Sequence, residues 1–173
     1  MKYWTCFLLV VLFSSCQSSD KNEVKIDWSQ KRSSDFGKEL AIEEDMNIRM
    51  YLEQRKSWKV EETGTGLRYY IYEKGNGPLA QSGLTAKVRF KITLLTGEVC
   101  YQTEGNEVES FKIDKSDIES GVQEGIKKMH VGDKAKLIIP SHLGHGLVGD
   151  FDKIPPLTTI VVDLELISLN FKK

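Results

Sequence analysis

The 173-residue sequence has little net charge, only three cysteines and no apolar run long enough to cross a bilayer. Its formal charge of −1 provides no excess of basic residues, which argues against a nucleic-acid-binding surface. The apolar run at residues 7–13 is far shorter than the ~20 residues of a transmembrane helix. The sequence also has no internal repeat and no low-complexity tract. With 40% hydrophobic residues, such a chain is expected to form one globular domain with an N-terminal extension.

Residues 1–15, MKYWTCFLLVVLFSS, combine a basic start with a short apolar run and small residues, as in a secretory signal. Ser14 and Ser15 lead directly into Cys16, an order that resembles a bacterial lipoprotein signal. The resemblance implies cleavage before Cys16, lipidation of that cysteine and anchoring to a membrane of the cell envelope, at the outer membrane or the periplasmic face. The alternative is an ordinary signal peptide followed by a chance cysteine. After processing, Cys100 would be alone, so no intrachain disulfide is expected.

Two segments separate this signal from the domain. Residues 16–34 are polar and charged, which predicts a flexible tether. Residues 35–60 are rich in helix-forming residues and are predicted as a helical extension. Its apolar stripe is weak, because Glu44 interrupts it. The stripe consists of Leu40, Glu44, Ile48 and Leu52. We expect a helix that packs partly on the domain or spaces it from the membrane. Since there is no sustained heptad pattern, a monomer is favoured over a dimer.

Residues 61–173 contain several stretches of alternating apolar and polar residues, the pattern of half-buried strands. The clearest stretches are 86–94, 134–139 and 160–166. Between them, Val122, Ile126 and Met129 are spaced as one face of a short helix. The expected fold is therefore α+β, with a curved antiparallel sheet wrapped around one short helix.

The motifs of this domain are specific enough to indicate a family. GVQEGIKKMHVGDKAKLIIP, then HG at 145–146, and then IPPLTTIVVDLEL resemble FKBP-type peptidyl-prolyl cis-trans isomerases from about residue 63 to 169. A looser similarity links the short tether, the helix before the domain and the Val99-Cys100-Tyr101 segment to FKBP-like lipoproteins of gliding bacteria. The resemblance implies the curved sheet described above and activity on proline-containing polypeptides.

The reaction of this family is rotation about an X–Pro amide, whose barrier is roughly 18–20 kcal/mol. An apolar cup that desolvates the amide and fits its twisted form can lower this barrier without a reactive side chain. No cofactor is expected. By resemblance, the catalytic positions are Phe90, Tyr101 and His145. The positions that would bind substrate are Ile118, Glu119, Val122, Leu143, Ile154 and Val162.

Several of these positions differ from the family pattern. Phe90 lacks the hydroxyl of the usual tyrosine, Val122 replaces a tryptophan and Val162 replaces a phenylalanine. The usual Phe-Asp pair falls on Cys100-Tyr101, or on Tyr101-Gln102 if the preceding turn is one residue longer, and the second alignment makes Tyr101 the aromatic wall. In both alignments the acid is missing. These changes predict a wider, more polar cup.

Each position also has a purely structural interpretation. Phe90 alternates with core residues, and Val122 and Val162 are ordinary core residues by position. Tyr101 fits a half-exposed strand position, and Ile154 beside two prolines fits a packed loop. His142 and His145 are three residues apart but have no third ligand nearby, so no metal site is expected. Two functions follow: an envelope isomerase with weakened activity, or a non-catalytic FKBP-like lipoprotein that binds peptides or acts as a chaperone for an envelope machine.

Overall fold

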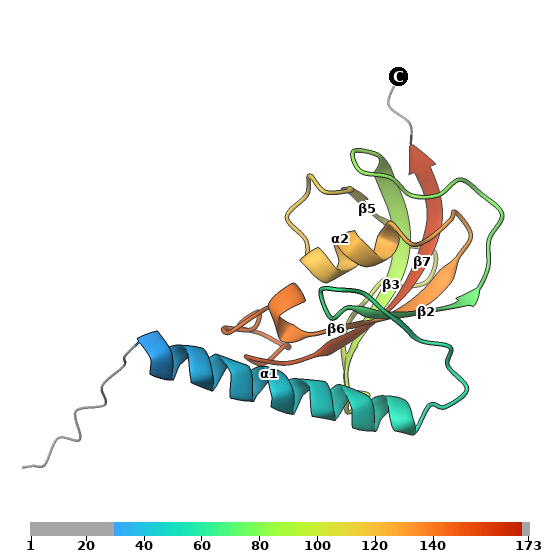
Figure 1. Cartoon of the computed structure of the whole chain (residues 1–173). Helices are drawn as coiled ribbons and strands as arrows, with labels where there is room; N and C mark the ends of the chain where they lie inside the picture. The colour runs from blue at the N-terminus through green and yellow to red at the C-terminus, as the bar shows by residue number, and fades with distance from the viewer. Residues whose placement is uncertain (1–29, 171–173) are drawn as a thin grey trace, which may run out of the picture.

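The computed structural model describes residues 30–170, with side chains from Asp35 onward. The predicted signal peptide and the lipidation site at Cys16 lie outside the described residues. The described chain forms a seven-stranded antiparallel sheet and two α-helices (Figure 1). The predicted α+β class is therefore confirmed. None of the described helices is both long and apolar enough to cross a membrane.

The sheet has the strand order β1-β2-β6-β7-β3-β4, and β5 also pairs with β3. Its strands are β1 (Glu61–Glu62), β2 (Arg68–Glu73), β3 (Thr85–Leu94), β4 (Val99–Gln102), β5 (Glu109–Lys112), β6 (Lys134–Ile139) and β7 (Ile160–Asn170). The predicted alternation along β3, β6 and β7 is confirmed, because Val88, Leu137 and Leu164 are all almost fully buried. Their apolar faces form one core under helix α2.

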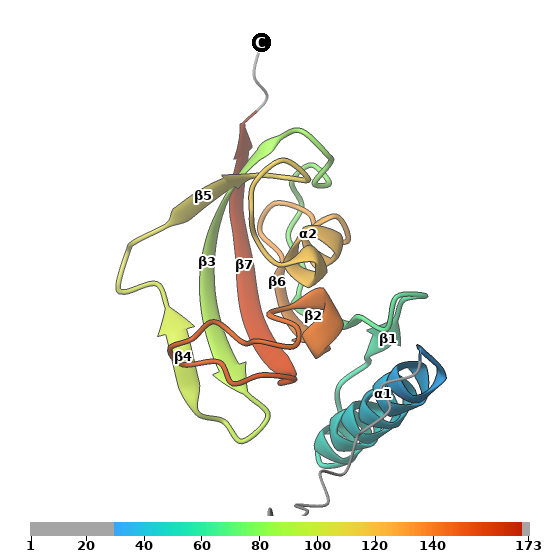
Figure 2. The ribbon, with the colours of Figure 1, turned by 90° about the vertical axis from the view of Figure 1, so that its left-hand side faces the viewer.

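Helix α2 (Ser120–Ile126) lies across the inner face of the curved sheet (Figure 2). Two glycines allow this close approach. A Cβ at Gly125 would lie 2.6 Å from the Leu137 side chain, and one at Gly121 would lie 2.5 Å from Ile139. The Gly-x-x-x-Gly spacing in the family motif is thus a packing requirement of the helix against β6. Together with Ile126, which is fully buried, it fixes the position of the residues at the start of the helix.

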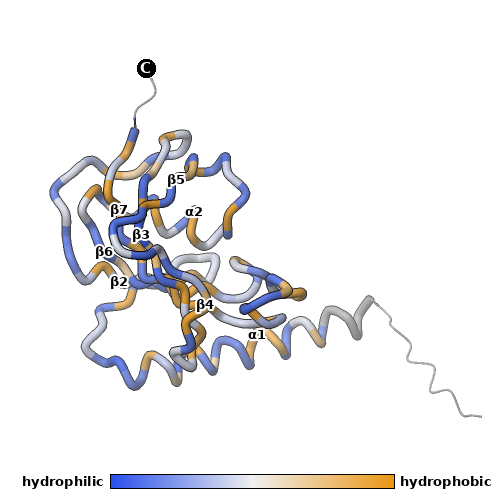
Figure 3. The backbone as a smooth tube through the Cα atoms, turned by 180° about the vertical axis from the view of Figure 1, so that it is seen from behind, coloured by the Kyte–Doolittle hydropathy of each residue, from blue (hydrophilic) through white to orange (hydrophobic). Residues whose placement is uncertain are grey.

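Helix α1 (Gln30–Glu53) packs on the opposite, outer face of the sheet (Figures 1 and 2). Ile48 of α1 is 1% exposed and contacts Ile138 of β6 and Val161 of β7. These two strand residues face outward, where their neighbours are charged. Along α1, hydrophilic and hydrophobic residues alternate (Figure 3), and the apolar ones that are buried face the sheet. The helical extension is therefore docked onto the domain.

Glu44, which interrupts the predicted apolar stripe of α1, makes several of the polar contacts of the docked helix. Its carboxylate accepts hydrogen bonds from the Ser141 backbone N–H (2.7 Å), the Ser141 hydroxyl (2.9 Å) and the Thr159 hydroxyl (2.6 Å). A neighbouring ion pair joins Asp45 to the buried guanidinium of Arg68. The interpretation of Glu44 as a flaw in the stripe is wrong, because the contact surface of α1 is partly polar.

The bounds of α1 also differ from the predicted segment 35–60, since the helix begins at Gln30 and ends at Glu53. Around the end of α1, the chain is held by contacts of aromatic side chains. Trp58 stacks on Tyr70 with 5.7 Å between ring centroids, and the Arg55 guanidinium covers the Tyr51 ring at 3.5 Å. These contacts lead the chain from α1 to β1 along the outer face.

Candidate functional site

The predicted cup residues come from five parts of the fold. Phe90 lies on β3, Tyr101 on β4 and Val162 on β7. The other predicted residues lie around α2 or in the loop between β6 and β7: Ile118, Glu119, Val122, Leu143, His145 and Ile154. The seven apolar or aromatic members belong to the main core cluster or pack against it. Residues that are far apart in sequence thus belong to or pack against one core.

The floor of this region is aliphatic. Val122, Ile154 and Val162 are 7%, 2% and 1% exposed, so each is a core residue as well as a candidate wall. Phe90 and Tyr101 are half-buried and pack against this floor. A β-branched floor leaves more room than the aromatic side chains of the family pattern, but it offers less surface for a proline ring.

A β-bulge sets the orientation of Tyr101. Ile92 pairs with Tyr101 and Thr93 pairs with Val99, so Cys100 is the extra residue between them. The bulge allows Cys100 to be buried while Tyr101 still packs against the core. Burial raises the pKa of the Cys100 thiol, which disfavours a reactive thiolate.

The Tyr101 hydroxyl is held by two acids that sequence reasoning did not single out. It donates to Asp150 at 2.5 Å and lies 3.3 Å from Asp152. Asp150 in turn accepts the backbone N–H groups of Asp152 (2.9 Å) and Ile154 (2.8 Å). Phe151, between Asp150 and Asp152, has a positive φ of 64°. The Asp-x-Asp spacing, typical of an Asx turn, was the available signal. This network fixes the loop that carries Ile154.

The electrostatics of this network are consistent with its geometry. The hydrogen bond to Asp150 raises the pKa of Tyr101, so the phenol remains a donor. Burial opposes ionisation of Asp150, but the bonds from Tyr101 and from backbone N–H groups outweigh it and hold the pKa of Asp150 below its ordinary value. The Tyr101 hydroxyl is therefore already engaged before any peptide binds.

Glu119 and His145 face each other within the predicted site. Glu119 immediately precedes α2 and does not cap it through its side chain. Instead, its Oε1 lies 2.9 Å from Nε2 of His145, and both side chains are about one-fifth exposed. The orientation does not meet hydrogen-bond geometry, so among the described residues Nε2 is a buried polar atom without a directed partner. Such atoms are uncommon in folded proteins and suit a site that accepts a ligand.

His142 points elsewhere. Its Nε2 is 2.9 Å from the backbone oxygen of Thr65, in the loop before β2. Within residues 30–170, no group of three or more His, Cys, Asp or Glu side chains has an arrangement that could hold a metal ion. The two histidines therefore have separate surroundings: His142 contacts a backbone loop and His145 lies beside Glu119.

The curved antiparallel sheet around α2 defines an FKBP-like domain. The family model described as "FKBP-type peptidyl-prolyl cis-trans isomerase" matches residues 77–167. The chain belongs to this family, as the sequence motifs predicted.

Individual relatives agree with this assignment. The chain is 36% identical over 112 residues to the isomerase FkpA of Escherichia coli strain K12, a match that covers 64% of this chain and 40% of FkpA. It is 33% identical over 119 residues to a probable FKBP-type isomerase of Haemophilus influenzae, covering 68% of this chain and 48% of that protein. The chain thus spans less than half the length of these two relatives.

Solved structures show the same fold. The crystal structure of Escherichia coli FkpA superposes with a TM-score of 0.66 at 31% identity, covering 80% of this chain and 64% of that one. An isomerase from Pseudomonas syringae gives a TM-score of 0.62 at 27% identity, covering 71% and 90%.

Proposed function

We propose that this protein is a peptidyl-prolyl cis-trans isomerase that acts on exported polypeptides at the cell envelope, with activity weakened by its substituted cup. The observation that carries the proposal is the half-buried cluster of Phe90, Tyr101, Ile118 and Leu143 around an aliphatic floor, in a chain of the isomerase family. An apolar cup of this kind can desolvate an X–Pro amide and favour its twisted form.

Polar groups of the site would orient the peptide. Nε2 of His145 lacks a directed partner among the described residues and can donate to a peptide carbonyl once the Glu119 carboxylate moves aside. The backbone N–H of Glu119, next to α2, is a second donor in the same region. Activity would be reduced because the floor is aliphatic and because the Glu119 carboxylate lies within the cup, where an apolar ring would have to displace or desolvate it.

The test is exchange-spectroscopy NMR on an X–Pro peptide with the full-length chain. We expect faster cis–trans exchange, and we expect Tyr101→Ala to lower it at least tenfold. Tyr72→Ala is the matched control, because Tyr72 is an exposed tyrosine on the outer strand face and bonds to Asp163. Equal losses in both variants would contradict the assigned site.

A second candidate function is favoured by one observation. The Tyr101 hydroxyl is taken by Asp150, so this predicted catalytic group cannot donate to a peptide without giving up a hydrogen bond within the protein. A non-catalytic module that holds peptides for an envelope machine would fit this arrangement. Peptide binding without faster exchange in the same NMR experiment would favour it over the isomerase.

The envelope location rests on the Cys16 signal and is tested separately. Cys16→Ser should release the protein from the membrane fraction, whereas Ser18→Ala, a nearby change that keeps the cysteine, should not. Retention of Cys16→Ser in membranes would contradict a lipid anchor. Light scattering of the detergent-solubilised protein would test the expected monomer.

A further inference from the structure

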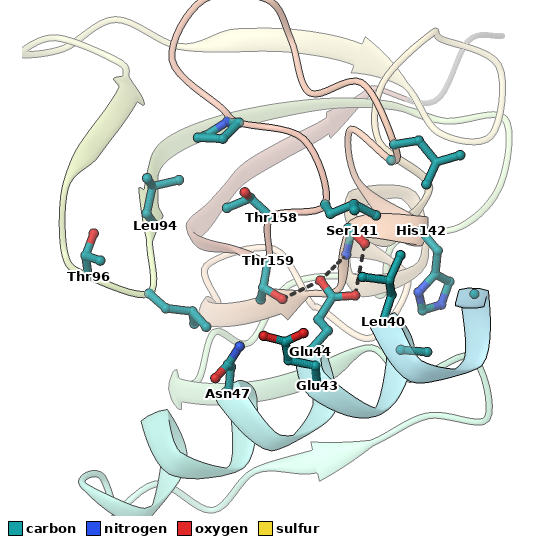
Figure 4. A pocket seen from close by; sticks show the side chains of 17 residues that line it. Leu40, Glu43, Glu44, Asn47, Leu94, Thr96, Ser141, His142, Thr158 and Thr159 are labelled. Carbon is teal, nitrogen blue, oxygen red and sulfur yellow. Dashed lines mark hydrogen bonds between the residues drawn. The ribbon is translucent and has the colours of Figure 1, made fainter. Parts of the chain in front are cut away.

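A cleft of about 580 Å³ lies between α1 and the loops of the domain (Figure 4). None of the nine predicted cup residues lines it. Its apolar walls come from three elements: α1, the β3–β4 turn and the loop between β6 and β7. The aliphatic lining residues are Leu40, Ala41, Leu94, Leu95, Leu147 and Leu157. A volume of this size accommodates several side chains of a ligand.

The polar lining of the cleft includes two acids. Glu43 and Glu44 both line it, whereas no lysine or arginine does. Figure 4 shows Glu44 reaching from α1 to Ser141 and Thr159, the donors of its three hydrogen bonds. All three donors are neutral, and within the described residues neither glutamate is part of an ion pair. The cleft therefore carries two carboxylates, and its lining, which also includes His142, has no lysine or arginine to balance them.

Exposed aliphatic side chains stand at the mouth of the cleft. Leu147 is 74% exposed and Leu157 is 39% exposed, although both are large hydrophobic residues. Leu157 has a positive φ of 54°, and its N–H donates to the backbone oxygen of Gly146 at 2.9 Å. This hydrogen bond ties Leu157 to Gly146, the residue before Leu147. It therefore holds the segments that bear the two leucines together. Apolar side chains held in this way at a cleft indicate an interaction surface.

We propose that the cleft binds an extended segment of a client polypeptide in which a basic residue alternates with aliphatic residues. The basic side chain would lie over Glu43 and Glu44, and its neighbours would pack on Leu147 and Leu157. Charge complementarity selects this occupant: an anionic lipid surface or an acidic segment would be repelled by the same carboxylates. Recognition needs no proline, so this site is independent of the isomerase cup.

The probe is a fluorescein-labelled, proline-free peptide of alternating lysine and leucine, measured by fluorescence anisotropy with the full-length chain. We expect saturable binding that weakens as salt is added. We expect Glu43→Gln and Leu147→Ser each to weaken it about fivefold, the factor that corresponds to about 1 kcal/mol. Both side chains are solvent-exposed, so neither change should unfold the protein.

Two matched controls distinguish binding in the cleft from nonspecific binding to the protein surface. Glu39→Gln removes an exposed acid from the same helix, and Val148→Ser removes an exposed aliphatic residue from the same loop; neither residue lines the cleft. Both should leave the affinity unchanged. A peptide with glutamate in place of lysine should not bind, and one with serine in place of leucine should bind at least fivefold more weakly.

Three results would overturn the proposal. The first is equal binding of the lysine and glutamate peptides, and the second is an equal loss of affinity in the control and cleft variants. The third is a dimer in light scattering that Leu147→Ser dissociates, which would assign the cleft to a second copy of the chain. Loss of isomerase activity would not affect the outcome of these binding measurements, because the probe contains no proline.

Discussion

Glu44 of α1 accepts a hydrogen bond at 2.7 Å from the backbone N–H of Ser141, 97 residues further along the chain. Ser141 begins the short 3₁₀ turn, Ser141–Leu143, that leads into His145. The same carboxylate reaches the Thr159 hydroxyl, just before β7. One side chain of the N-terminal helix thus holds both ends of the loop that carries the polar group of the predicted cup.

Removing this carboxylate should destabilise the protein. Ser141 and Thr159 are 6% and 4% exposed, so Glu44→Ala leaves buried donors without an acceptor. The expected loss in the free energy of unfolding is about 2–4 kcal/mol, measured by urea denaturation. Glu44→Gln, which keeps one acceptor oxygen, should lose less. Glu43→Ala, which removes an adjacent exposed carboxylate, should change stability by less than about 0.5 kcal/mol. Equal losses at 43 and 44 would contradict the docking role of Glu44.

The sheet and α2 could be predicted because their signals are local. Alternation along 134–139 placed Leu137 inside, and the spacing of Ile126 and Met129 indicated the apolar face of the short helix. The sequence contains a weaker signal for the docking of α1: Ile138 and Val161 are apolar residues on the outer, charged face of their strands. That pattern shows that something covers the outer face, but it does not name the element. Glu44 looked unfavourable because its partners lie more than ninety residues away.

The candidate site could be predicted by position but not by contact. Family motifs located Phe90, Tyr101 and His145; the first two pack against the main core, and His145 lies beside Glu119. The contact between Glu119 and His145, and the bond from Tyr101 to Asp150, join residues that only the folded loop brings together. That loop depends on a left-handed residue, Phe151, whose type gives no local indication of such a conformation. The sequence therefore showed which family residues of the cup are replaced, but not which side chains fill the space that those residues would occupy.

Helix α2 should not tolerate a methyl group at Gly125. Alanine is the better helix former by about 1 kcal/mol, but its Cβ would lie 2.6 Å from the side chain of Leu137, which is fully buried. Overpacking of this kind outweighs the gain, so Gly125→Ala should lower the free energy of unfolding by about 1–3 kcal/mol in urea denaturation. Gly64→Ala is the control, because nothing lies within 4 Å of a Cβ there. A Gly125→Ala variant as stable as Gly64→Ala would contradict the observed packing.

Asp150 should make stability depend on pH in the acid range. Its pKa is held below the ordinary value of about 3.9, so its ionised form favours the folded state. This contribution is fully present above about pH 4 and is lost as pH falls through the lower pKa of the folded state. The stability difference between the wild type and Asp150→Asn should be constant from about pH 5 to 8 and should shrink below about pH 4 in urea denaturation.

The Tyr101 hydroxyl contributes to this effect. Tyr101→Phe removes the 2.5 Å donor to Asp150 and should cost about 1–2 kcal/mol at pH 7. It should also weaken the acid dependence, because one of the bonds that lower the pKa of Asp150 is gone. A difference between wild type and Asp150→Asn that persists unchanged at pH 3 would contradict this account.

Replacing Glu119 should raise activity. Its carboxylate lies 2.9 Å from His145 in a partly buried position, where an entering proline ring must displace it or strip its water. Glu119→Ile removes that cost and adds an apolar wall, so kcat/KM for an uncharged X–Pro peptide should rise about fivefold, equivalent to about 1 kcal/mol of barrier. Exchange-spectroscopy NMR measures the effect. Glu124→Gln is the control, because Glu124 lies on α2 but bonds to Thr65. A fall in activity in Glu119→Ile would instead mean that the carboxylate orients His145 for the substrate.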